Sequence, residues 1–409
     1  MSLPAAPAIA AAPNAPVPID ADERLHSLDI LRGLALAGMI LVHFHQRLET
    51  PVTGAEDLIG WFVWIFVEQK AWGTFAFLFG VGFAVLLRRV ESRGEAVVPL
   101  YLRRLAGLAL FGIIAQVGLG FHVLFEYACW GLVLLMVRHW STRALLILAV
   151  LAACARPIVV ESMALYAWWH PAPAAAAGPN LWAGANEATR LASYGATLAT
   201  RWALFLATLP RHWRDFLPSS NLTLFILGLL AVRHRVFDEP LRHVRLIAGW
   251  ATFGVLSWAL WWIARILPEV PAPFVDWPLK SAFGLVQDQW LTFGYVGTVV
   301  LLLAYRPLWV ERLRSFGLAG RMALTNYMIQ AAVFDVLGSA YGFNLKLRPY
   351  AYIVAAPILF AAQASFSGAW LARYRFGPLE WLWRCMTYAR WQPLARERTV
   401  SAPVVASAS

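Results

Sequence analysis

Cysteine is scarce in this sequence of 409 residues and occurs only at Cys129, Cys154 and Cys385. The three residues are widely spaced and form no CxxC pair. Because disulfide frameworks and thiolate metal sites both need grouped cysteines, the sequence indicates neither.

Charged residues are also scarce. They make up 14% of the sequence, whereas hydrophobic residues make up 60% and the mean hydropathy is +0.59. The apolar residues come in blocks of about 17–25 residues, the length that crosses a bilayer. This composition excludes an ordinary soluble fold. We therefore predict an all-α fold, a polytopic bundle of transmembrane helices whose partner is the lipid bilayer.

The net charge of +11 does not indicate a nucleic-acid partner. The arginines fall in short clusters between the apolar blocks rather than along one hydrophilic face. Such a distribution encodes membrane topology, because cytoplasmic loops carry an excess of Lys and Arg. We predict no nucleic-acid binding.

Ten apolar segments are predicted to span the membrane. They cover residues 27–45, 70–87, 103–120, 122–138, 144–164, 217–233, 246–264, 286–304, 321–339 and 351–371. Each even-numbered span is followed by an arginine-rich loop, and the short loops between are poor in Lys and Arg. By the positive-inside rule, both termini are expected in the cytoplasm.

One transmembrane domain is predicted over residues 25–392. Residues 1–24 are Ala/Pro-rich without a basic start, so we expect a disordered leader rather than a cleaved signal. Residues 393–409 are expected to form a disordered cytoplasmic tail. The long outer loop, residues 166–216, is expected to carry an amphipathic helix on the outer surface. Residues 58–70 either form a similar helix or lengthen the second span.

The first predicted span, LDILRGLALAGMILVHFHQ, places ionisable groups in an apolar helix. Arg32 and His43 are separated by nearly three helical turns, so they share a face about 16 Å apart along the axis. Asp29 joins that face near Arg32. The side chains of His43 and His45 diverge by about 200° and cannot chelate one ion from a regular helix. No metal site is predicted.

Two interpretations of this face stay open. Arg32 offers a planar fork of donors that suits the phosphate oxygens of a ligand entering from the cytosol. His43 titrates near neutrality and is able to take a proton from an acceptor hydroxyl or amine. Alternatively, Asp29 and Arg32 form an interfacial pair that fixes the helix end, and His43 is hydrogen-bonded inside the bundle.

The stretch GRMALTNYMIQ opens the ninth predicted span, and its Asn326 and Gln330 share a helix face. In a functional interpretation Arg321 is a second phosphate contact and Asn326 donates to a developing oxyanion. In a structural interpretation the two amides hydrogen-bond to neighbouring helices. Asp335, deeper in the apolar block, needs a partner in either case.

Two further stretches predict local structural features. In FLFGVGFA, Gly80 and Gly82 indicate the close approach of another helix. FGPLEWLWR, residues 376–384, is predicted to lie on the cytoplasmic membrane surface, because its Gly-Pro pair breaks the preceding helix and its tryptophans suit the headgroup level.

Four of these stretches carry a family resemblance when taken together. They are SLDILRGLALAGMILVH, FLFGVGFA, GRMALTNYMIQ and FGPLEWLWR. They resemble the YeiB-like family of bacterial polytopic membrane proteins, whose biochemical role is undefined. The resemblance runs from residue 24 to residue 392 and implies a multi-pass protein of the bacterial inner membrane.

The Arg-Gly pair, the apolar run and the histidine that follows it are also similar to the first span of integral-membrane acyltransferase family 3. That resemblance implies acyl transfer from a cytosolic acyl-CoA to acceptors at the far side, with a first-span histidine in catalysis. Lysosomal heparan-glucosaminide acetyltransferase belongs to a related group. The resemblance places Arg32 and His43 in these roles.

Two main hypotheses of function follow. In the first, the protein is a membrane acyltransferase with acyl-CoA as co-substrate and no bound cofactor, and His43 is the catalytic base that activates a sugar, lipid or small metabolite. Its predicted binding residues are Asp29, Arg32, Arg321, Asn326 and Gln330. In the second, the same residues line the path of a transporter for a small anionic solute. A third hypothesis is a non-catalytic membrane component that needs a partner subunit.

Overall fold

The computed structural model describes residues 26–50, 52, 57–94, 96–121, 123–169, 184, 187–211, 221–266 and 276–396. Within these ranges every regular element is a helix, and the β pairing is limited to two isolated bridges. The all-α prediction is confirmed for this part of the chain. The predicted leader, residues 1–24, and residues 397–409 of the predicted tail lie outside the described residues.

Ten helices of the described chain coincide with the ten predicted apolar segments. They are α1 (His26–His43), α3 (Gln69–Ser92), α4 (Val97–Ile113), α5 (Val123–Val137), α6 (Thr142–Trp169), α10 (Asn221–Arg233), α11 (Val244–Ile266), α12 (Asp276–Tyr305), α15 (Ala323–Gly338) and α16 (Pro349–Arg373). The largest difference is in α12, which begins well before the expected start at residue 286. The apolar block begins later than the helix because the first turns of α12 contain Asp276, Pro278 and Lys280.

Four helical stretches are long and apolar enough to cross a bilayer. They are His26–Leu48, Leu58–Ser92, Val97–Gly118 and Pro349–Arg373. The chain is therefore a helical membrane protein. The count of ten spans and the cytoplasmic location of both termini stay predictions.

Short π-helical turns extend or interrupt three of the long helices. They are η2 (Phe44–Leu48), η4 (Trp64–Glu68) and η5 (Ile114–Gly118). The turn η4 joins α2 (Asp57–Val63) to α3 without a break, so residues 58–70 lengthen the second span. Such turns are frequent at functional sites. Here η2 follows His43 directly.

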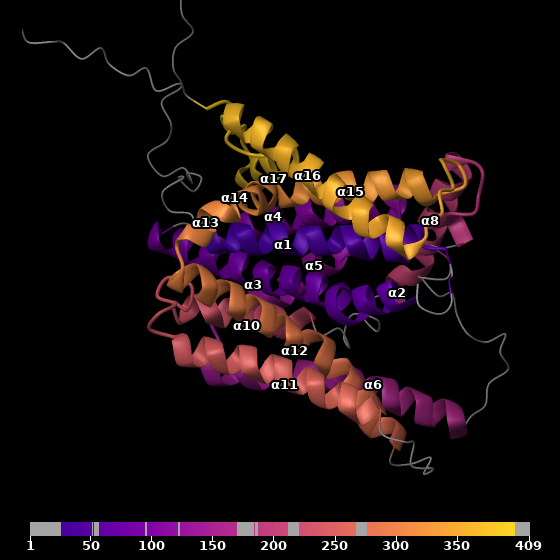
Figure 1. Cartoon of the computed structure of the whole chain (residues 1–409). Coiled ribbons are helices and arrows are strands. Elements are labelled where there is room, and N and C mark those ends of the chain that lie inside the picture. The colour runs from indigo at the N-terminus through magenta and orange to yellow at the C-terminus, as the bar shows by residue number, and fades with distance from the viewer. Residues whose placement is uncertain are drawn as a thin grey trace, which may run out of the picture.

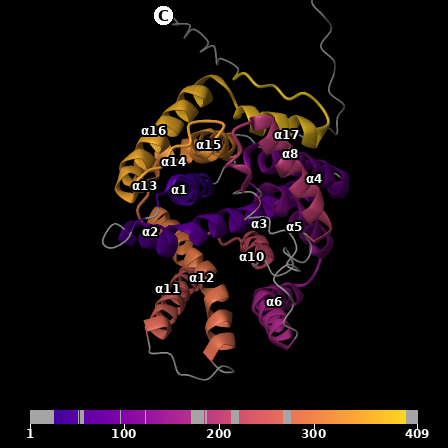
Figure 2. The ribbon, with the colours of Figure 1, turned by 90° about the vertical axis from the view of Figure 1, so that its right-hand side faces the viewer.

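Helix α1 lies in the middle of the bundle (Figures 1 and 2), enclosed by α3, α15, α16 and the short helix α14 (Arg314–Arg321). At one end of α1 lie α14 and α13 (Leu308–Arg312), and at the opposite end lies α8 (Tyr194–Thr208). We call these the Arg32 end and the His43 end. Helix α17 (Pro378–Tyr388) packs on α4 and α15.

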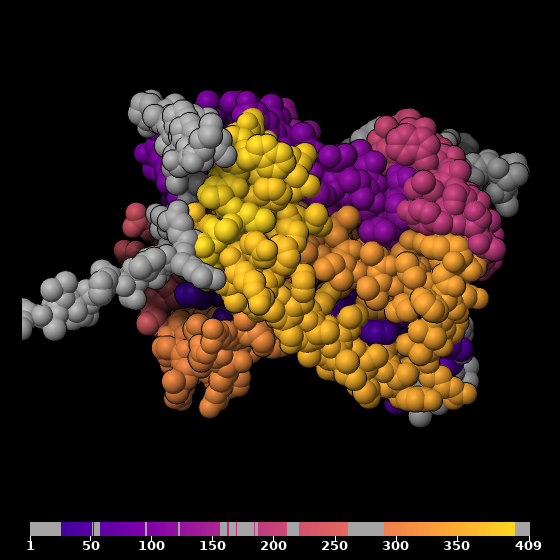
Figure 3. Space-filling view, turned by 90° about the horizontal axis from the view of Figure 1, so that it is seen from above, coloured from indigo at the N-terminus to yellow at the C-terminus, as the bar shows by residue number. Residues whose placement is uncertain are grey.

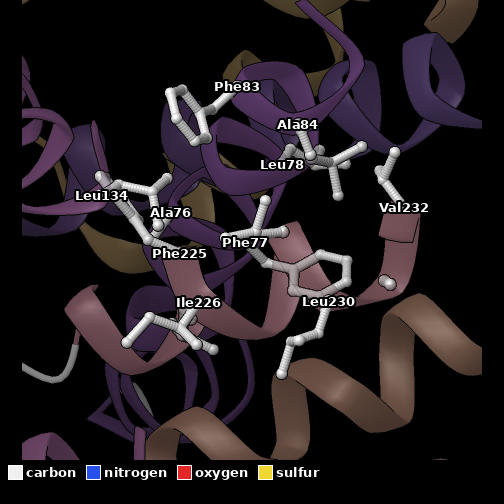
Figure 4. Packing of buried hydrophobic residues seen from close by; sticks show 14 of the residues in the cluster. Ala76, Phe77, Leu78, Phe83, Ala84, Leu134, Phe225, Ile226, Leu230 and Val232 are labelled. Atoms are coloured by element: carbon white, nitrogen blue, oxygen red, sulfur yellow. The ribbon is translucent and has the colours of Figure 1, made fainter. Parts of the chain in front are cut away.

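The main apolar core joins α3 to α10 (Figure 4). The rings of Phe79 and Phe225 stack with centroids 4.6 Å apart. A Cβ atom on Gly80 would collide with the backbone of Phe225, and one on Gly228 would collide with the backbone of Phe77. The predicted close approach of another helix is therefore confirmed at Gly80 but not at Gly82, where a Cβ would lie 3.8 Å from the Arg32 side chain.

The outer surface of the bundle carries large exposed apolar side chains. They include Ile147, Val150 and Leu151 on α6, Phe253, Leu256 and Leu260 on α11, and Ile353, Val354 and Ile358 on α16. Figure 3 shows α16 and α17 covering one face, with α8 at its end. Exposed apolar area of this extent suits contact with lipid rather than water.

Replacing Gly80 with alanine is expected to lower the free energy of unfolding by about 1–3 kcal/mol, because the new methyl group meets a backbone that cannot move aside. Gly82→Ala is the matched control, since a Cβ there lies 3.8 Å from the nearest neighbouring atom. Thermal unfolding in detergent measures both. Equal melting temperatures for the two variants would contradict the backbone contact.

Candidate functional site

The Arg32 end of α1 holds an ion pair beside a tight helix crossing. Arg32 Nη1 donates to Asp29 Oδ1 at 2.8 Å, and the Arg32 side chain is 30% exposed. A Cβ on Gly33 would collide with the backbone of Phe316 in α14, and one on Gly320 with the backbone of Asp29. Because backbone meets backbone here, the position of Arg32 is fixed relative to α14.

Two further arginines lie at this end. The Arg104 guanidinium lies 3.8 Å from the centroid of the Trp383 ring, and Trp383 Nε1 donates to the Arg104 carbonyl at 2.8 Å. Arg104 is close enough to Arg32 for the two charges to repel. Arg321 is the last residue of α14, directly after the glycine that touches α1. The Arg32 end is therefore strongly cationic.

Glu380 of α17 caps α15 from outside that helix. Its carboxylate accepts from Thr325 N at 2.9 Å and from Thr325 Oγ1 at 2.6 Å. Burial raises the pKa of Glu380, and the hydrogen bonds from Thr325 act in the opposite direction. The surface segment predicted for residues 376–384 thus also holds the first turn of α15.

Asn326 and Gln330 join α15 to α16 and α1. Asn326 Nδ2 donates to Ala319 O at 3.0 Å and to Ser367 Oγ at 2.9 Å. Gln330 Nε2 donates to Gln363 Oε1 at 2.9 Å and more weakly to the Leu36 carbonyl at 3.4 Å. The amide hydrogens are engaged within the bundle, which is the geometry of the structural interpretation.

His43 lies at the far end of α1, away from lipid. It is 1% exposed, and its ring lies 4.6 Å from Phe121, 5.3 Å from Phe334 and 6.4 Å from Tyr327, measured between centroids. Its Nδ1 is buried without a hydrogen-bond partner among the described residues. Buried polar atoms are normally paired, so this nitrogen is available to a ligand.

Arg47 stands one turn beyond His43, in η2. Its guanidinium lies 4.7 Å from the centroid of Phe121, the ring that also packs against His43. Arg47 Nη2 donates to the carbonyl of Gly120. Arginine and histidine therefore both contact one aromatic ring.

Asp335 finds its partner in α8. Arg201 Nη2 donates to Asp335 Oδ1 at 2.6 Å and Nη1 to Oδ2 at 3.1 Å, and both side chains are 2% exposed. Asp335 also accepts from Ser339 Oγ at 3.1 Å and from Tyr341 OH. Burial and the contact with Asp335 raise the pKa of Tyr341 to about 12, so its hydroxyl remains a donor.

Helix α8 is amphipathic with its polar side turned inward. Its buried residues are Thr197, Arg201, Phe205 and Thr208, and its exposed apolar residues are Tyr194, Leu198, Trp202 and Leu206. The helix falls inside the predicted outer segment, residues 166–216, of which 170–183, 185–186 and 212–216 lie outside the described residues. An apolar exposed face suits a helix that dips into the membrane.

The six predicted site residues lie along α1 in order. Asp29, Arg32 and Arg321 are at one end and His43 is at the other. Gln330 contacts the middle through the Leu36 carbonyl, and Asn326 precedes it by four residues on α15. Sequence reasoning missed Arg47, Arg201 and Glu380. Arg47 carried a signal, since it stands four residues after His43 on the same helix.

Comparisons with known proteins match both halves of the chain. Residues 24–184 match the family model "Heparan-alpha-glucosaminide N-acetyltransferase, catalytic", and residues 231–390 match "Protein of unknown function (DUF418)". No solved structure matches significantly.

Three curated relatives are uncharacterized. Uncharacterized protein YxaH of Bacillus subtilis (strain 168) is 31% identical over 93% of this chain and 98% of its own length. A 39.9 kDa protein in the amylase 3'region of Bacillus acidopullulyticus is 29% identical over 92% of this chain and 97% of its own length. Uncharacterized protein YeiB of Escherichia coli (strain K12) is 31% identical over 32% of this chain and 31% of its own length.

Asp335→Asn is expected to destabilise the protein by about 3–5 kcal/mol, because it leaves the Arg201 guanidinium buried without a countercharge. Asp238→Asn is the matched control: it removes the carboxylate of the exposed pair that Arg88 Nη1 forms at 2.7 Å, which is worth about 0–1 kcal/mol. Melting temperatures in detergent compare the two. Similar losses in both variants would show that burial does not set the strength of the Asp335 pair.

Proposed function

This chain belongs to the family of the uncharacterized protein YxaH, with a DUF418 match over residues 231–390, and from that premise we propose that it is a membrane acyltransferase. It moves an acyl group from a cytosolic acyl-CoA to a hydroxyl or amine of a sugar, lipid or small metabolite. The observation that carries the proposal is the buried, unpartnered Nδ1 of His43 on a helix whose other end presents Arg32. The match of residues 24–184 to an acetyltransferase catalytic model supports it.

The donor side of the reaction lies at the Arg32 end. The phosphates of acyl-CoA bind the guanidinium groups of Arg32 and Arg321, each of which offers several N–H donors in one plane. Asp29 orients Arg32 through the 2.8 Å contact and moderates its charge. In this proposal the Arg32 end faces the cytosol of a bacterial inner membrane, and acyl-CoA is a co-substrate rather than a bound cofactor.

The reacting carbonyl lies toward the His43 end. Arg32 and His43 are about 16 Å apart along the axis, a path that the pantetheine arm of CoA follows when its phosphates stay at Arg32. Asn326 and Gln330 have a structural role in this proposal. Their amides hold α15 against α16 and α1 between the two ends. The pantetheine arm therefore runs beside the hydrogen-bonded amides of Asn326 and Gln330.

His43 acts as the general base. Its imidazole takes the proton from the acceptor hydroxyl or amine as the acceptor attacks the thioester carbonyl. The new C–O or C–N bond forms, the C–S bond breaks, and CoA leaves as a thiol with the proton that His43 returns. The aromatic rings of Phe121, Phe334 and Tyr327 keep bulk water away from this step.

Binding of acetyl-CoA to the purified protein in detergent tests the donor side. Arg32→Ala is expected to weaken binding by about tenfold or more, since a bidentate phosphate contact is lost. Arg88→Ala is the matched control. Arg88 is on α3, the helix whose Gly82 lies beside Arg32, but its guanidinium is paired with Asp238. Absence of saturable binding by the folded wild-type protein would overturn the proposal in favour of a transporter.

Slow hydrolysis of acetyl-CoA, with water as the acceptor, tests the catalytic side without knowledge of the natural acceptor. His43→Gln is expected to retain acetyl-CoA binding and to lower hydrolysis by about 100-fold. His45→Gln is the control, since His45 Nδ1 is engaged with Glu49 at 2.6 Å. Equal hydrolysis by the wild type and the His43 variant would remove His43 from the catalytic role.

A further inference from the structure

The His43 end holds a guanidinium that the proposed reaction does not use. Arg47 is partly buried, and among the described residues the Gly120 carbonyl is its one hydrogen-bond acceptor. A guanidinium carries five N–H donors and a permanent charge. Most of the bonding capacity of Arg47 is therefore left for another group.

The nearby carboxylates do not serve Arg47. Asp335 already accepts four hydrogen bonds, two from Arg201 and one each from Ser339 and Tyr341. A carboxylate has about four lone-pair sites, so Asp335 is saturated. Together Arg47, Arg201 and Asp335 carry one net positive charge.

Glu49 and Glu68, two other acidic residues near η2, are engaged elsewhere. Glu68 accepts from Gln46 Nε2 at 2.7 Å. Glu49 accepts from Tyr352 OH at 2.7 Å and contacts His45 Nδ1 at 2.6 Å. Neither carboxylate is among the charged groups that act on Arg47, which are Arg201 and Asp335. The positive charge beside His43 is therefore not balanced by the described carboxylates.

A glycine brings the two arginines to one point. Gly120 has a φ of +73°, and a Cβ there would lie 3.0 Å from Arg201 Nη2 and 3.2 Å from Arg47 Nη2. Both guanidinium groups donate to this turn, Arg47 to Gly120 O and Arg201 to Gly118 O at 3.1 Å. Any side chain at position 120 would occupy the space between them.

Three buried polar atoms from different elements lack partners near this point. They are His43 Nδ1, Tyr327 OH and Arg201 Nε, each unpaired within the described part of the chain. Electrostatic coupling links Arg47 to Arg201 and Tyr327, and His43 to Arg47. A cationic site with several unpaired polar atoms is suited to a polar, negatively charged ligand.

We propose that Arg47, flanked by Arg201, binds an oxyanion of the acyl acceptor, so that the acceptor is a hydroxylated or amino compound carrying a carboxylate or a phosphate. This inference rests on the proposed function and narrows its acceptor to anionic compounds. The oxyanion accepts from the Arg47 fork, and the nucleophilic hydroxyl or amine of the same molecule lies toward His43. Arg47 is a binding residue and exchanges no proton.

The bond changes are those of the proposed transfer. The acceptor O–H or N–H proton passes to His43, the C–O or C–N bond forms at the thioester carbonyl, and the C–S bond breaks. CoA leaves as a thiol after His43 returns the proton. The charge of the oxyanion on Arg47 is the same before and after.

Titration of the full-length protein in detergent with inorganic phosphate and with acetate, at constant ionic strength set by chloride, tests the site. Isothermal calorimetry is expected to detect saturable binding of at least one anion, weakened about tenfold or more in Arg47→Gln. Arg88→Gln, an exposed arginine at the other end, is expected to bind as the wild type does. Binding of acetate indicates a carboxylate acceptor, and binding of phosphate alone indicates a phosphorylated one.

Two further variants keep the test decisive. Arg32→Gln tests whether phosphate binds at the donor side instead of at Arg47. Binding that depends on Arg32 and not on Arg47 would overturn the inference. Arg47→Lys keeps the charge but loses the planar fork, and it carries the comparison if Arg47→Gln does not fold. Absence of saturable binding of either anion to the wild type would also overturn it.

Acetyl-CoA binding to the same wild-type sample separates this inference from the proposed function. If acetyl-CoA binds and neither anion does, the acyltransferase proposal stands and the anionic acceptor is wrong. If an anion binds through Arg47 and acetyl-CoA does not bind, the anion site stands and the acyltransferase proposal fails. The latter result would favour a transporter of anionic solutes.

Discussion

The close crossing of α1 with α14 is the constraint on which the arrangement of polar groups depends. Gly33 and Gly320 each remove a side chain that would hold these helices apart. After Met322 the chain enters α15, which continues along α1 as far as Phe334 beside His43. Residues 314–338 therefore accompany the first helix over its whole length and bring polar side chains to both of its ends.

Polar groups inside an apolar bundle are costly unless they are paired. Hydrogen bonds of Asp335, Arg201, Asn326 and Gln330 join helices, although Arg201 Nε, Asn326 Oδ1 and Gln330 Oε1 have no partner among the described residues. His43 and Arg47 have unused hydrogen-bonding capacity at one end of α1. The paired groups hold the positions of the unpaired ones, which is the arrangement that a substrate site needs.

The helices follow from apolar blocks of membrane length, and the sharing of a face by Asn326 and Gln330 follows from their spacing. The Arg201–Asp335 pair could not be predicted, because its members are 134 residues apart and local periodicity carries no information on such contacts. Periodicity identified α8 as amphipathic but did not indicate that its polar side faces the protein. Similarly, the spacing of Glu380 gave no sign that it caps α15, since that contact depends on how α17 packs.

The central claim is that Arg32 and His43 lie at opposite faces of the membrane, with Arg32 toward the cytosol. Sided labelling of single cysteines, in a chain without its three native ones, tests this most directly. Ser92→Cys reports the Arg32 end and Phe343→Cys the His43 end, and both positions are exposed. An impermeant maleimide is expected to label Phe343→Cys in right-side-out vesicles and Ser92→Cys only in inverted vesicles. The reverse pattern, or labelling of both from one side, would contradict the account.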